Sequence, residues 1–206
     1  MTIDEAALVE PVSVPLHAIY KIGGGLAPYD RVAVFGGGPI GMLAVVICKS
    51  LGAPVIMVEP MPFRAEMAKR LGADRVVDPT QVDAGAEIQK FYNGKGATLI
   101  LECSGSNGGI ASAMDCMALG ARVVLIGHSR GRKVPAEVGM LIWQDAYIGG
   151  SKASPYFIPK ALDAMSRKIF DPTAVVTHRF KLDDIETALK LGHEASECGK
   201  ILIYPS

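Results

Sequence analysis

The chain has 206 residues; half are hydrophobic, only 6% are aromatic, and 21 basic and 21 acidic side chains cancel to a formal net charge of zero. This balance, without any basic stripe, argues against a nucleic-acid partner. The N-terminus lacks the pattern of a signal peptide and no apolar run is long enough to span a membrane, so we expect a cytoplasmic protein without membrane contact.

Apolar residues at near-helical spacing open the chain over positions 6–21, are interrupted by Pro11 and Pro15, and stop at three glycines, 23–25. Short runs rich in Val and Ile then alternate with helical patterns. We predict strands over 31–35, 55–58, 75–77, 98–102, 121–126 and 147–149, and helices over 39–51, 64–71, 83–92, 110–118 and 155–167. Such alternation predicts βαβ units, hence an α/β fold with a doubly wound parallel sheet of the Rossmann type.

The tail departs from this alternation at Asp171-Pro172. Residues 175–180 have an extended pattern, 182–191 a helical one and 200–204 the pattern of an apolar strand. These elements fit either an addition to the edge of the sheet or a separate unit.

The four cysteines, Cys48, Cys103, Cys116 and Cys198, show no C-x-x-C spacing. A zinc knuckle is therefore not expected, and we interpret them as reduced, buried thiols.

Gly36, Gly38 and Gly41 form G-x-G-x-x-G between the first predicted strand and the first helix of the sheet. In this context the first glycine permits a tight turn, the second lets a diphosphate approach the backbone, and the third allows the helix to pack closely on the strand. Pro39 and Ile40 begin the helix, whose free N–H groups and dipole favour an anion. The motif predicts a dinucleotide-binding site.

Glu59 follows 18 residues after Gly41, at the end of the second predicted strand. A carboxylate there can accept hydrogen bonds from the adenosine ribose hydroxyls and would repel a 2′-phosphate, so NAD is favoured over NADP. Arg64 can stack on the adenine, meet a phosphate, or simply face water.

Two further strand ends should face the same crevice, because ligands of open α/β sheets bind beyond the carboxyl ends of the strands. Ser104 follows the fourth predicted strand, and Gly127 and His128 follow the fifth. We expect groups there to reach the nicotinamide half of the cofactor; His128 is equally well read as a loop side chain in solvent.

Five segments, "EAALVEPVSVPLHA", "VAVFGGGPIGMLAVVICKSLGA", "LECSGS", "VVLIG" and "VVTHRF", occur in an order that resembles the zinc-dependent medium-chain dehydrogenase/reductase family, in its sorbitol and threonine dehydrogenase branch. The resemblance implies an NAD-dependent alcohol or polyol dehydrogenase with a GroES-like catalytic domain before the Rossmann domain. It divides this chain into a linker helix from that catalytic domain (1–25), an NAD-binding Rossmann domain (26–170) and a C-terminal return segment (171–206).

The zinc ligands that the family carries before its Rossmann domain do not appear here: the one G-H-E tripeptide, Gly192-His193-Glu194, lies near the C-terminus, and no cysteine precedes Cys48. Glu10 matches the glutamate that the family places near or on the catalytic zinc, but one carboxylate cannot form a site that wants three protein ligands. Lys152 lies close to where relatives place an arginine beside the substrate, and Lys200 near a position used against the cofactor phosphates. Glu10 and Lys200 also fit plain surface charges.

We therefore expect a chain that binds NAD(H), lacks zinc, and is inactive toward alcohols alone. The resemblance also implies a homodimer through the sheet edge near residues 141–149. Two other readings stay open: an NAD-sensing or regulatory module without catalysis, and a methyltransferase, whose first strand also ends in glycines and whose second ends in an acid. Gly41 and the Pro39-Ile40 helix start argue against the methyltransferase.

Overall fold

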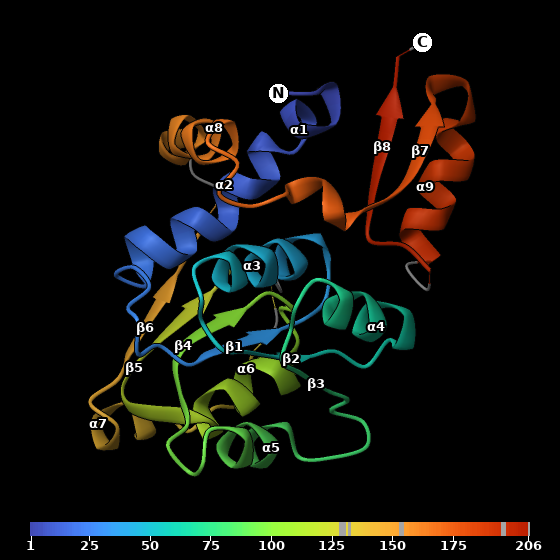
Figure 1. Cartoon of the computed structure of the whole chain (residues 1–206). Coiled ribbons are helices and arrows are strands. Elements are labelled where there is room, and N and C mark those ends of the chain that lie inside the picture. The colour runs from blue at the N-terminus through green and yellow to red at the C-terminus, as the bar shows by residue number, and fades with distance from the viewer. Residues whose placement is uncertain (128–130, 132, 153–154, 195–196, 206) are drawn as a thin grey trace.

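The computed structural model describes residues 1–206 apart from 128–130, 132, 153–154, 195–196 and 206. A six-stranded parallel sheet in the order β3-β2-β1-β4-β5-β6 confirms the predicted fold (Figure 1). Its strands are β1 (Val32–Phe35), β2 (Val55–Val58), β3 (Arg75–Val77), β4 (Ala97–Glu102), β5 (Met117–Leu125) and β6 (Tyr147–Gly150). The winding reverses between β1 and β4, and this switch point is where open α/β sheets bind ligands.

Helices cover both faces of the sheet (Figure 1). Because side chains alternate along a strand, Val32 and Val34 of β1 face one core while Ala33 and Phe35 face the other. All four are buried, which explains the continuous apolar run in the sequence. The first core is shared with α2 (Val9–His17), α3 (Pro39–Ser50), α4 (Pro62–Arg70) and α8 (Ile158–Ser166), the second with α5 (Ala84–Phe91) and α6 (Asn107–Asp115).

The helix predicted over 110–118 ends earlier than expected. The α6 helix begins after Ser106, whose Oγ accepts a hydrogen bond from the Gly109 N–H at 2.9 Å, and stops at Asp115. The Cys116 carbonyl then accepts the Ala97 N–H at 2.8 Å, and Met117 pairs with Ala97 of β4. Pairing with a distant strand therefore overrides the local helical pattern.

The N-terminal segment packs into the same core as the sheet. The α1 helix (Ile3–Ala7) leads into α2 and a π-helical turn, Ala18–Ile22, and Leu8, Val12 and Ile19 are fully buried. Arg122 of β5 donates to the carbonyls of Gly23 and Gly25, at 2.6 and 2.8 Å. Asp30, which is 1% exposed, pairs with Arg122 and accepts the Ala27 N–H at 2.6 Å. No helix among the described residues is long and apolar enough to cross a bilayer.

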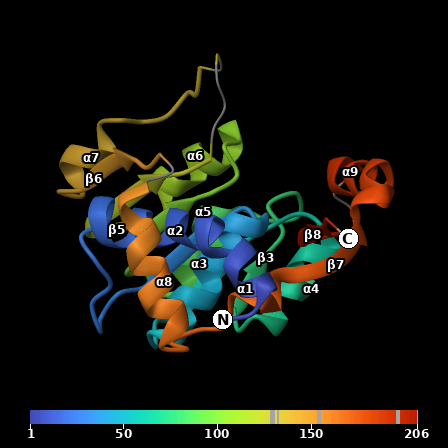
Figure 2. The same ribbon diagram turned by 90° about the horizontal axis from the view of Figure 1, so that it is seen from above.

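The C-terminal segment forms a separate unit, which decides between the two alternatives that the sequence left open. The strands β7 (Val176–Lys181) and β8 (Lys200–Tyr204) pair in parallel with each other and not with the main sheet, and α9 (Ile185–Glu194) lies beside them (Figure 2). Val175 and Leu202 join this unit to the main core. Arg179 also donates to Asp4 of α1 at 2.8 Å, from its Nε to Oδ2. Shorter elements are α7 (Met140–Trp143) and the 3-10 turns Pro155–Phe157, Pro172–Val175 and Leu182–Asp184.

Candidate nucleotide-binding site

A cleft of about 480 Å³ lies at the carboxyl ends of β1, β2 and β4. It is lined by the turn after β1, the end of β2, the first turn of α4 and the loop after β4, with Gly36, Gly38, Glu59, Arg64, Ser104 and Ser106 among its residues. These are the elements that flank the switch point of the sheet, so the cleft lies where the topology predicts a ligand.

Each of the three glycines of the motif is required for a different physical reason. Gly36 has φ +93°, a left-handed conformation that other residues rarely adopt. A β-carbon on Gly41 would lie 1.9 Å from the carbonyl oxygen of Gly36, so only glycine lets α3 approach the turn. For Gly38, no described residue beyond its chain neighbours lies within 4 Å of a β-carbon placed there. Its missing side chain therefore leaves open space in the cleft.

That open space faces the start of α3. Gly38 is the N-cap residue and makes no side-chain cap, and Pro39 and Ile40 form the first helical positions. The early N–H groups of a helix have no acceptor within the helix, and its dipole adds positive charge at this end. The turn therefore offers an anion both room and donors.

Glu59 links the end of β2 to the glycine turn. The side chain is 4% exposed; Oε2 accepts the Gly37 N–H at 2.5 Å and Oε1 accepts the Met61 N–H at 2.8 Å. A carboxylate has about four acceptor positions, so each oxygen keeps capacity for a hydroxyl donor from a ligand. Glu59 thus holds the turn in shape while still offering an acceptor to the cleft.

Arg64 lies on the first turn of α4 and lines the same cleft. Its Nε is buried and has no hydrogen-bond partner among the described residues. A buried donor without a partner is costly and rare in folded proteins. A ligand acceptor in the cleft would remove that cost.

The loop after β4 is organised by Glu102, a residue that the sequence did not single out. Its carboxylate is fully buried and accepts the N–H of Ser104 and the N–H of Gly105, each at 3.0 Å, as well as the Ser104 hydroxyl. Burial raises the pKa of Glu102, and these hydrogen bonds offset part of the rise. The signal available in the sequence was an acid at the end of a buried strand, followed by Cys103-Ser104-Gly105.

The same residue connects this loop to the end of β5. The Glu102 carbonyl accepts the N–H groups of Ile126 and Gly127, both at 2.8 Å. A β-carbon on Gly127 would lie 2.1 Å from the Gly105 nitrogen, so the two loops are in direct backbone contact. Ser104 in turn lies against Gly36, where a β-carbon would come within 2.8 Å of the Ser104 nitrogen. The strand-end loops of β1, β4 and β5 are therefore packed as one surface.

A family model described as "Zinc-binding dehydrogenase" matches residues 39–167. The chain belongs to this family. The match begins at the first residue of α3 and runs to the end of α8, and it confirms the resemblance seen in the sequence motifs.

Relatives and solved structures in the zinc-binding dehydrogenase family agree with this assignment. The sorbitol dehydrogenase of Bacillus subtilis is 29% identical over 208 residues, which cover 100% of this chain and 58% of that protein. The scyllo-inosose 3-dehydrogenase of Thermotoga maritima is 48% identical over 100 residues, 48% of this chain and 25% of that protein. The crystal structure of 2R,3R-butanediol dehydrogenase from Bacillus subtilis superposes with a TM-score of 0.90 at 28% identity, covering 100% of this chain and 59% of the other. The chain thus spans less than two thirds of the length of these relatives.

The donors in this chain do not fit the zinc ion that gives the family its name. Glu10 is exposed on α2, and no three His, Cys, Asp or Glu side chains in the described part of the chain lie close enough together to hold a metal. All four cysteines are free; Cys48, Cys116 and Cys198 are buried and Cys103 is half-buried. Burial raises the pKa of Cys48 to about 12, so its thiol stays protonated. We derive no step through zinc from these residues.

The remaining predicted site residues do not gather at the cleft. Lys152 is exposed after β6, and Lys200 begins β8 in the separate C-terminal unit; neither belongs to the lining of the cleft. His128 lies outside the described residues. Of the predicted cofactor residues, the structure brings Gly36, Gly38, Glu59, Arg64 and Ser104 to one cleft, with Gly41 and Gly127 behind them.

Proposed function

We propose that this chain binds NAD(H) in the cleft between β1, β2 and β4, as the cofactor-binding half of a zinc-type alcohol or polyol dehydrogenase. The observation that carries the proposal is the open position at Gly38, which lies at the N-terminus of α3 beside a buried carboxylate. The family match and the dehydrogenase names of the relatives support it.

In this proposal each half of the cofactor has its own residues. The diphosphate lies over Gly38 and the first turn of α3, where backbone donors meet it. Glu59 accepts the adenosine ribose hydroxyls through its free acceptor positions and disfavours a 2′-phosphate, which selects NAD over NADP. Arg64 closes the adenine side of the cleft and gains an acceptor for its buried Nε.

The nicotinamide half lies toward Ser104 and Gly127. The packed loops there fix the face that the nicotinamide ring presents, because Glu102 hydrogen-bonds to the loop after β4 and to the loop after β5. When bound, the nicotinamide supplies hydride transfer with an alcohol substrate, and the protein supplies orientation and exclusion of water. The described residues of this chain add no zinc ligand set, so we expect no turnover of sorbitol or threonine by the chain alone.

Thermal denaturation with NAD, NADP and S-adenosylmethionine side by side tests this proposal. At a ligand concentration of about 100 times the dissociation constant, binding stabilises the fold by about 2.7 kcal/mol. For a chain of this size that shift is about 5–10 °C. We expect it with NAD, a smaller one with NADP and none with S-adenosylmethionine. A shift with S-adenosylmethionine alone would replace the dehydrogenase proposal with a methyltransferase.

We also propose that two copies associate through the β6 edge of the sheet. β6 is the last strand in the order, so one side of its backbone has no neighbouring strand in the sheet. Apolar side chains beside it are unusually exposed: Ile142 is 86% exposed, Trp143 82% and Tyr147 53%. An exposed apolar patch at an open strand edge is typical of an interface. Light scattering that shows only monomers at high concentration would contradict this.

A further inference from the structure

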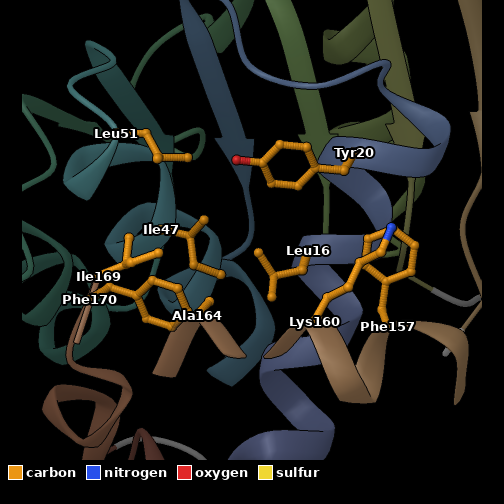
Figure 3. A pocket seen from close by; sticks show the side chains of 9 residues that line it. All are labelled: Leu16, Tyr20, Ile47, Leu51, Phe157, Lys160, Ala164, Ile169 and Phe170. Atoms are coloured by element: carbon orange, nitrogen blue, oxygen red, sulfur yellow. The ribbon is translucent and has the colours of Figure 1, made fainter. Parts of the chain in front are cut away.

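A second pocket lies away from the nucleotide cleft, in the helical layer over the other end of α3. It has a volume of about 230 Å³ and is enclosed by the end of α2 and its π-helical turn, the second half of α3, α8 and the segment after α8 (Figure 3). Its lining consists of Leu16, Tyr20, Ile47, Leu51, Phe157, Lys160, Ala164, Ile169 and Phe170. None of these residues lines the nucleotide cleft.

The walls of this pocket suit one aromatic ring. Three aromatic side chains, Tyr20, Phe157 and Phe170, surround a space whose other lining side chains are aliphatic, apart from Lys160 (Figure 3). Aromatic rings favour edge-to-face and offset contacts with one another. An engineered apolar cavity of about 150 Å³ binds benzene, so the volume here accommodates a ring with one small substituent. It is too small for a helix or a loop of another protein.

The mouth of the pocket is open and apolar. Tyr20 is 45% exposed, Leu51 42% and Ile169 38%. Apolar side chains gathered around a concave opening leave apolar surface in water, which a bound ligand would remove. The pocket therefore has both an entrance and a reason to be filled.

The charge on the pocket lies at one side only. Lys160 is the one charged residue in its lining, and its Nζ lies 4.3 Å from the centroid of the Phe157 ring. Lys160 forms no ion pair among the described residues, and no acid lines the pocket. The Tyr20 hydroxyl points toward Leu51 and away from Lys160 (Figure 3). An anion is therefore favoured beside Lys160. The C-terminal end of α3 lies on the other side of the pocket (Figure 3), where the negative end of the helix dipole would repel an anion.

We propose that this pocket binds a small aromatic monocarboxylate, with the ring among Phe157, Ile47 and Phe170 and the carboxylate at Lys160. The walls select an aromatic body, and the volume limits it to a single ring. The Lys160 ammonium, which has no ion-pair partner in the described part of the chain, selects a negative group. This ligand is independent of the nucleotide cleft, so the site stands whether or not the chain binds NAD.

Benzoate and benzyl alcohol, two probes of similar size that differ in charge, test the proposal. Each is titrated into the whole chain while the side-chain methyl resonances are followed by NMR. We expect saturable shifts at Leu16, Ile47, Leu51 and Ile169, with benzoate binding more tightly than benzyl alcohol. Lys160→Gln should weaken benzoate about threefold to fivefold, as expected for a solvent-exposed ion pair, and leave benzyl alcohol unchanged.

Two further variants make the result decisive. Lys90→Gln removes one charge from α5, on the opposite side of the sheet, where the lysine side chain is 72% exposed; it should bind benzoate like the wild type. Ala164→Phe fills the pocket and should abolish the binding of both benzoate and benzyl alcohol. The proposal is overturned by shifts confined to the nucleotide cleft, by equal loss of benzoate in the two lysine variants, or by line broadening that depends on protein concentration, which would mean that a second copy covers the pocket.

Discussion

Replacing Gly38 with alanine should separate cofactor binding from folding. The residue has φ −69° and ψ 176°, a conformation that alanine adopts without strain, and its β-carbon would meet no described residue beyond the chain neighbours. Such a substitution stabilises a fold by up to about 1 kcal/mol, because the unfolded chain loses freedom. We expect the melting temperature of Gly38→Ala to be unchanged or raised by up to about 4 °C.

The same methyl group occupies the space that we assign to the diphosphate. Forcing an extra methyl group into a filled space costs about 1–3 kcal/mol, which corresponds to a loss of NADH affinity of about 5-fold to 150-fold. Titration of NADH fluorescence measures this loss, and thermal denaturation without ligand measures the stability. A folded Gly38→Ala protein that binds NADH as tightly as the wild type would refute the placement of the diphosphate.

Gly41→Ala is the matched control. Its β-carbon would lie 1.9 Å from the Gly36 carbonyl oxygen, which belongs to the backbone and cannot move aside cheaply. We expect this variant to lose about 1–3 kcal/mol or more of stability, a drop in melting temperature of about 2–12 °C. Gly38→Ala should therefore weaken NADH binding and leave the stability intact, whereas Gly41→Ala, three residues away, should lower the stability.

Three other predictions concern the Asp30–Arg122 ion pair, the loop after β4 and the β6 edge of the sheet. Asp30→Ala should cost about 3 kcal/mol in urea denaturation, because it leaves Arg122 without its buried partner. Burial pushes the pKa of Asp30 up, but hydrogen bonds and the Arg122 charge outweigh this and hold the pKa below its usual value. The contribution of Asp30 to the free energy of unfolding is therefore complete above the ordinary pKa of about 3.9 and is lost as pH falls through the lower pKa of the folded state. If wild type and Asp30→Ala differed in stability as much in strong acid as at neutral pH, the assignment would be contradicted. Glu102→Gln turns an amide toward the N–H groups of the β4 loop, each unsatisfied donor costing about 1–3 kcal/mol; calorimetry should show NADH binding weakened and ADP-ribose binding retained, and equal loss of both would count against a role at the nicotinamide half. Trp143 is the only tryptophan in the chain, so its fluorescence should shift to the blue as protein concentration rises, and Ile142→Glu should prevent that shift if β6 forms the interface.

Much of the fold was predictable because strands and helices depend on local chemistry. Alternating faces in β1, proline at the start of α3 and the glycine motif are properties of short segments, and the structure places these elements as expected. The predicted end of α6 was wrong by three residues, because the N–H of Ala97 in the neighbouring strand β4 donates a hydrogen bond to the Cys116 carbonyl. Local patterns carry no information about such a partner.

The site divides in the same way. The motif alone predicted that the glycine turn, the start of α3 and Glu59 lie together, because it encodes a close backbone approach that only glycine permits. The structure places Gly36, Gly38 and Glu59 in the lining of one cleft. Two features became visible only in the folded chain: Glu102 hydrogen-bonds to both the β4 and the β5 loop, and Lys200 belongs to a two-stranded sheet apart from the main one. Those contacts depend on which strands become neighbours, and that choice is made by packing of the whole chain rather than by any one segment.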